Sequence, residues 1–99
     1  MKHTSNKISE YKKELVEIFS KILGDKKLMT EFLTDILTPT EFEALALRWQ
    51  IVKQLNRGET HRSIADDLSL GISTVTRGSR EFRNKNGGFH LMLKKISNR

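Results

Sequence analysis

The chain of 99 residues contains no cysteine, which excludes a disulfide framework and any catalysis by a thiolate. It has no apolar run near the roughly 20 residues that a helix needs to span a bilayer. The first seven residues, Met-Lys-His-Thr-Ser-Asn-Lys, lack the apolar segment of a signal peptide. We therefore expect a cytoplasmic protein that does not associate with a membrane.

Arrangements that would support catalysis or metal binding are also missing. No nucleophile and base occur at a spacing that would bring them together. His61 and His90 lack cysteine neighbours and have no second ligand at helical spacing, so we expect no metal site. We predict that the chain is not an enzyme and has no cofactor.

Positive charge is in excess. Lysine and arginine number 18 against 12 acidic residues, which gives a net charge of +6 and a pI near 9.8. The excess is uneven, because residues 58–99 carry eight basic and four acidic side chains, whereas residues 1–57 carry ten and eight. A basic C-terminal part favours an anionic partner such as nucleic acid.

Apolar residues recur at the three- and four-residue spacing of helices, and the alternation typical of strands is absent. The spacing predicts one helix over residues 8–23, ended by Gly24, and a second over 28–37 that is apolar on much of its circumference. A short helix of this kind needs cover from several sides. A further helix is predicted over residues 88–97, after the Gly87–Gly88 pair.

A central helix is predicted over residues 38–57. Thr38 is placed to cap it, Pro39 takes the first helical position, Glu41 completes a capping box, and Gly58 ends the helix. Its apolar residues are distributed around more than one face, which a chain this short can hardly cover from within. We expect a second subunit to complete the packing; an ordinary buried helix in a monomer is the alternative.

Residues 60–83 have the pattern of a helix-turn-helix. Thr60 is expected to cap a helix ending at Leu68, and Ser69–Leu70–Gly71 to form the turn before a recognition helix over 71–83. One face of that second helix is polar and basic and is expected to face DNA: Ser73, Thr76, Arg77, Arg80 and Arg83. The opposite stripe is expected to dock on the core: Ile72, Val75, Ser79 and Phe82.

Two stretches resemble the Trp repressor family. These are Leu37–Leu45 followed by Arg48, and the box Gly71-Ile-Ser-Thr-Val-Thr-Arg-Gly-Ser79; the similarity covers roughly residues 37–83. The resemblance implies an all-α, six-helix, intertwined homodimer that binds operator DNA when L-tryptophan fills a pocket beside each recognition helix. The whole chain, 1–99, would then be one domain, with residues 1–37 as dimerisation helices.

The resemblance also implies a ligand site. Arg48 and Arg77 would stack on the two faces of the indole, and Arg77 with the Thr38 hydroxyl would hold the carboxylate. Gly78 would leave room for the ring, and carbonyl groups near Leu37 of the partner subunit would accept the ammonium. Alternative roles are an ion pair of Arg48 with an acidic neighbour, a phosphate contact for Arg77 and simple packing at Gly78.

For DNA, the resemblance implies contacts from Arg62 in the first helix of the motif and from four residues in the second. Those four are Ile72, Ser73, Thr74 and Thr76. Arg80 and Arg83 would bind phosphates, so that affinity falls steeply with salt. The alternative for these arginines is a solvated basic face.

The sequence departs from tryptophan-binding members at three places. The linker 58–61 is one residue shorter, Glu81 replaces a small hydroxyl residue near the indole, and residues 84–89 resemble a sister group of Trp-repressor-like proteins. Despite these departures, the resemblance implies a repressor of tryptophan biosynthesis or transport genes that uses L-tryptophan as corepressor. The alternatives are a related regulator with another effector or none, and a helical protein-interaction module.

Overall fold

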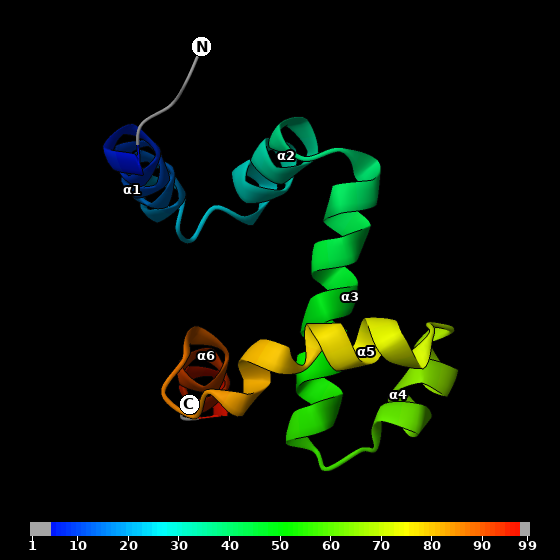
Figure 1. The fold of residues 1–99 in the computed structure, drawn as a ribbon. Coiled ribbons are helices and arrows are strands. Elements are labelled where there is room, and N and C mark those ends of the chain that lie inside the picture. The colour runs from blue at the N-terminus through cyan, green and yellow to red at the C-terminus, as the bar shows by residue number, and fades with distance from the viewer. Residues whose placement is uncertain (1–4, 98–99) are drawn as a thin grey trace. The chain divides into compact units, whose positions relative to one another are not determined.

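The computed structural model describes residues 5–97, with side chains from Lys7, and these residues form helices and connecting turns without any strand. The helices, labelled in Figure 1, are α1 (Ser5–Lys21), α2 (Lys26–Ile36), α3 (Pro39–Asn56), α4 (His61–Leu68), α5 (Ile72–Gly78), the 3₁₀ helix η1 (Arg80–Arg83) and α6 (Gly88–Ser97). The all-α prediction with six α-helices is confirmed. None of the helices in residues 5–97 combines the length and hydropathy that a bilayer crossing requires.

The chain divides into two compact units, residues 1–42 and 43–99, so that α3 begins in the first and continues in the second. In the first unit, α1 and α2 meet through Phe19 and Phe32, whose rings pack edge to face with centroids 5.4 Å apart. No side chain of residues 7–42 is fully buried. The first unit therefore leaves much of its apolar surface uncovered.

Hydrogen bonds from side chains fix where the helices begin. The Glu41 amide donates to Thr38 Oγ1 at 3.1 Å, and the Thr38 amide donates to Glu41 Oε1 at 2.8 Å, which is the predicted capping box. The Ser63 amide likewise donates to Thr60 Oγ1 at 3.0 Å, so Thr60 caps α4 as predicted. Gly58 has φ +87° just after α3, the left-handed conformation that ends helices.

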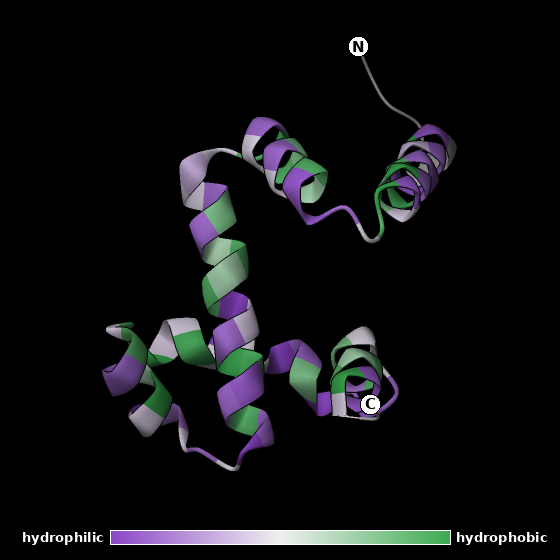
Figure 2. Ribbon diagram, turned by 180° about the vertical axis from the view of Figure 1, so that it is seen from behind, coloured by the Kyte–Doolittle hydropathy of each residue, from purple (hydrophilic) through white to green (hydrophobic). Residues whose placement is uncertain are grey.

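A small core holds the second unit together. It consists of buried side chains from α3, α4 and α5: Ile51, Ile64, Ala65 and Val75. The buried Gln54 adds a polar link, because its Nε2 donates to Asp67 Oδ2 of α4 at 2.9 Å. In Figure 1, α5 crosses the lower half of α3 beside α4. Figure 2 shows hydrophobic and hydrophilic residues interspersed along α3, as expected for a helix with several contacted faces.

The turn between α4 and α5 places its strain on a serine rather than on a glycine. Ser69 has φ 56° and ψ 44°, and its amide bonds the carbonyls of Ala65 and Asp66, whereas Gly71 has an ordinary φ of −71°.

Because the left-handed conformation costs a residue with a Cβ atom about 1 kcal/mol, we expect Ser69→Gly to raise the free energy of unfolding by roughly that amount. Urea unfolding followed by circular dichroism measures the change; a decrease would contradict the assigned conformation.

The predicted recognition helix over residues 71–83 is wrong in its second half. The α-helix ends at Gly78, and residues 80–83 form a 3₁₀ helix in which the Phe82 amide bonds the Ser79 carbonyl at 3.0 Å. Ser79 is 4% exposed, and its Oγ donates back to the Thr76 carbonyl at 2.8 Å, which ties down the last turn. Arg80 and Arg83 therefore do not continue the helical face of Ser73.

The predicted docking stripe is also only partly correct. Val75 and Ser79 are buried, and Phe82 is half-buried against α6, where its ring lies 4.4 Å from the ring of His90. His90 Nε2 lies 2.6 Å from the Phe82 carbonyl oxygen, so that nitrogen carries the proton. Ile72, by contrast, is 45% exposed and does not dock on the core.

Candidate ligand pocket and DNA-binding surface

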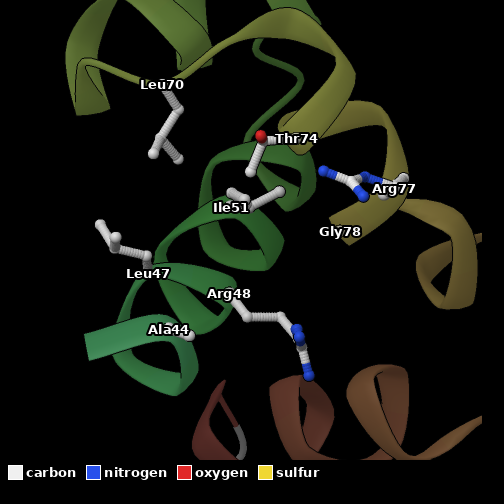
Figure 3. A pocket seen from close by; sticks show the side chains of 8 residues that line it. All are labelled: Ala44, Leu47, Arg48, Ile51, Leu70, Thr74, Arg77 and Gly78. Carbon is white, nitrogen blue, oxygen red and sulfur yellow. The ribbon is translucent and has the colours of Figure 1, made fainter. Parts of the chain in front are cut away.

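A hollow with a volume of about 420 Å³ lies between α3 and α5, within the second unit. Figure 3 shows the side chains around it, which come from α3, the turn before α5 and α5 itself: Ala44, Leu47, Arg48, Ile51, Leu70, Thr74, Arg77 and Gly78. The volume falls in the range of small-molecule sites. Apolar walls with two guanidinium groups suit a flat, partly apolar anion.

Arg48 and Arg77 approach this hollow from different helices. In Figure 3 the Arg77 guanidinium points from α5 back towards α3, and Arg48 extends from α3 at the other end of the hollow. Both arginines are exposed. Of the two acidic residues that precede Arg48 in α3, Glu41 is engaged in the capping box. The two arginines thus line one hollow, and their stacking on a ligand remains a prediction.

Gly78 lies where α5 packs against Ile51 of α3. A Cβ atom at this position would come within 3.0 Å of Ile51 Cδ1 and 3.8 Å of Ile51 Cγ2. The missing side chain is therefore used by the contact between the helices, as in the packing alternative. Since Ile51 also lines the hollow, a larger residue at 78 would push the isoleucine towards the space that a ligand would occupy.

Glu81 does not lie with these residues. It lines a second, largely apolar hollow of about 510 Å³ between α3, η1 and α6, together with Trp49, Phe89 and Met92. The rings of Trp49 and Phe89 lie 6.5 Å apart there. The structure thus separates Glu81 from the hollow that contains Arg48 and Arg77.

Leu37 and Thr38 belong to the first unit, at the junction of α2 and α3. The Leu37 amide donates to the Leu33 carbonyl at 3.0 Å, and Thr38 forms the capping box. Because both bonds of the box lie within one turn of the chain, Thr38 has a complete structural role without a ligand. Its proposed role in carboxylate binding remains a prediction.

The residues predicted to contact DNA lie mostly at the surface of α4 and α5. Arg62, Ile72 and Ser73 are exposed. Thr74 is exposed too but lines the hollow under α5. Thr76 is half-buried, and its Oγ1 lies 3.3 Å from Nδ1 of His61.

The two phosphate-binding candidates lie beyond α5. Arg80 and Arg83 are exposed on η1, and neither lines the hollow. Nearby, Lys85 places its Nζ 5.7 Å from the centroid of the Phe82 ring, a cation–π contact that keeps another positive charge at this end. The basic groups thus follow the second helix of the motif in sequence.

The apolar walls of the hollow were not predicted as ligand contacts. They are formed by Ala44, Leu47, Ile51 and Leu70. A signal was present, because residues 44, 47, 48 and 51 share one face of a helix at three- and four-residue spacing and include Arg48. Leu70 lies in the turn and has no periodic signal.

Comparison with known proteins identifies the family. A family model described as Trp repressor protein matches residues 11–97. A Trp operon repressor homolog of Vibrio vulnificus (strain YJ016) is 44% identical over 62 residues, which are 62% of this chain and 61% of the relative. A second from Vibrio campbellii (strain ATCC BAA-1116) is 38% identical over 79 residues, 77% of this chain and 78% of the relative.

A third Trp operon repressor homolog, from Haemophilus influenzae (strain PittEE), is 36% identical over 75 residues, 75% of this chain and 74% of the relative. The match thus spans about three fifths of the V. vulnificus relative and about three quarters of the other two. No solved structure matches the chain significantly. With a match over most of its length to the family model, the chain belongs to the Trp repressor family.

Proposed function

We propose that the protein is a transcriptional repressor that binds operator DNA as a homodimer, uses free L-tryptophan as its corepressor, and controls genes of tryptophan biosynthesis or transport. The single observation that supports this best is that Arg48, Arg77 and Gly78 share one hollow directly beneath α5. A ligand bound there contacts the helix that we expect in the major groove. Ligand binding and DNA binding then act on the same element.

The chemistry of the hollow fits an aromatic amino acid. Two guanidinium groups offer stacking surfaces for an indole ring and paired donors for a carboxylate. The apolar walls of Leu47 and Ile51 suit the rest of the ring. We therefore assign carboxylate binding to Arg77 and ring stacking to Arg48 and Arg77.

A ligand in this position changes DNA affinity by holding α5. The packing of α5 on α3 includes Val75, which shares a buried cluster with Ile51, and Gly78, which lies against Ile51. A ligand that bridges α3 and α5 restricts the motion of α5 and reduces the cost of ordering it on DNA. The coupling is reciprocal, so operator DNA must raise the affinity for tryptophan by the same factor.

Uncovered apolar side chains support the homodimer. Val16 and Leu23, in and after α1, are 64% and 75% exposed, and Leu91 of α6 is 63% exposed. Apolar exposure on this scale in a small chain favours association.

We expect a mass of twice the 11.5 kDa chain by light scattering at micromolar concentration. A monomer mass there would refute the dimer.

Isothermal titration with L-tryptophan tests the corepressor, and we expect saturation at one ligand per chain. Binding to duplexes enriched from a random-sequence pool then tests repressor action: affinity should rise with L-tryptophan and fall steeply as salt increases. No heat up to millimolar ligand, with salt-sensitive DNA binding retained, would favour a regulator with another effector. Absence of salt-sensitive DNA binding would favour a protein-interaction module.

A further inference from the structure

The hydrogen bond between His61 and Thr76 joins the two helices of the DNA-binding motif. His61 is the first residue of α4, and its Nδ1 lies 3.3 Å from Oγ1 of Thr76 in α5. Both residues are half-buried. The pair thus lies where α4 and α5 pack together, with part of each side chain open to solvent.

The Thr76 hydroxyl makes a bond that differs from those of the two threonines of α2. In α2, Thr30 Oγ1 donates to the Lys26 carbonyl at 2.9 Å, and Thr34 Oγ1 donates to the Thr30 carbonyl at 2.8 Å. These bonds stay within their own helix, which is common for threonine. The Thr76 hydroxyl is paired with a side chain of another helix instead.

This pairing decides what the Thr76 hydroxyl offers to a third group. A threonine hydroxyl has one proton to donate and lone pairs that accept. When His61 Nδ1 is unprotonated, Thr76 donates its proton to that nitrogen, and only lone pairs remain for another partner. When Nδ1 carries a proton, Thr76 accepts from it and keeps its own proton to donate. Base edges in the major groove differ in their pattern of donors and acceptors.

We propose that His61 is a positioning residue for DNA recognition. Its Nδ1 accepts a hydrogen bond from the Thr76 hydroxyl, so that the Thr76 oxygen presents a lone pair as acceptor to the amino group of adenine or cytosine. The inference rests on the proposed DNA-binding function and goes beyond it, because it assigns base specificity to a residue that does not itself touch the base. One base pair in each half-site then depends on residue 61.

The test is selection from a pool of duplexes with a random central sequence, with and without L-tryptophan, followed by sequencing. Base preference is the right measure, since phosphate contacts shift affinity without regard to sequence. We expect His61→Leu to reduce the preference for adenine or cytosine at one position per half-site about five-fold, the ratio for one hydrogen bond. His61→Asn keeps an acceptor on the side chain and should restore much of it.

Thr76→Val provides the control variant in which the effect of His61→Leu is measured again. It removes the hydroxyl, so the same preference should be lost, and His61→Leu should then cause no further change. Unchanged base preferences in His61→Leu would overturn the proposal. So would a change of base preference caused by His61→Leu in a protein that already carries Thr76→Val. Circular dichroism and thermal unfolding check that the variants fold. If the wild-type chain enriches no sequence under either condition, the DNA-binding proposal itself fails, and this one with it.

Discussion

Replacement of Arg77 by alanine is expected to weaken tryptophan binding about a hundredfold. Arg77 lines the hollow beneath α5, and its guanidinium points across the hollow towards α3. The substitution removes a charge-assisted hydrogen bond of about 2 kcal/mol and a stacking contact of about 1 kcal/mol. Together these correspond to roughly two factors of ten in affinity. Isothermal titration with L-tryptophan measures the loss directly.

Two matched variants separate the pocket role from a general effect of charge. Arg77→Lys keeps the charge but loses the planar fork, so we expect an intermediate loss. Arg80→Ala removes the next arginine, which is exposed on η1 outside the hollow. It should leave the titration unchanged while lowering the salt slope of DNA binding by about one. Unaltered heat in Arg77→Ala would remove Arg77 from the proposed site, and equal losses in both alanine variants would show a general charge effect.

The features that the sequence predicted well are those set by hydrogen bonds over one helical turn. The capping box of Thr38 and Glu41 and the cap of Thr60 depend on residues three positions apart. No distant contact is needed to form them, so sequence spacing is sufficient. The same holds for the end of α3, where Gly58 adopts the left-handed conformation.

The end of α5 could not be predicted in this way, because it depends on tertiary contact. Periodicity over residues 71–83 favours one continuous helix, yet the α-helix ends at Gly78. There the missing Cβ lets α5 approach Ile51 of α3, and the chain then tightens into η1. Neither the closeness of the two helices nor the packing of Phe82 on His90 has a signal in local spacing.

The candidate site residues likewise differ in whether the sequence could place them. Arg48, Arg77 and Gly78 came from the family resemblance, and the structure places them around one hollow. Glu81 came from the same resemblance and lies in a different hollow, because the 3₁₀ turn after Gly78 changes its direction relative to α5. A residue three positions past a helix end cannot be placed by counting helical turns.

Replacement of Ile64 by alanine is expected to lower the free energy of unfolding by about 3 kcal/mol. Ile64 has no exposed surface and packs on Ile51 and Val75, so the core of the second unit loses the methyl groups at its centre and keeps a cavity. Small proteins are stabilised by about 5–15 kcal/mol in total, so this is a large share. Urea unfolding followed by circular dichroism measures the change, at one fixed protein concentration because association contributes.

Ile72→Ala is the matched control for this loss. It makes the same chemical change, also in a helix, but at a side chain that is 45% exposed, so we expect a change within about 0.5 kcal/mol. Since Ile72 is expected to contact DNA, its substitution should instead weaken operator binding. Equal destabilisation by the two variants would mean that Ile72 is covered in solution, and the dimer would then bury the very surface that we assign to DNA. The pair of measurements therefore tests the core and the orientation of α5 together.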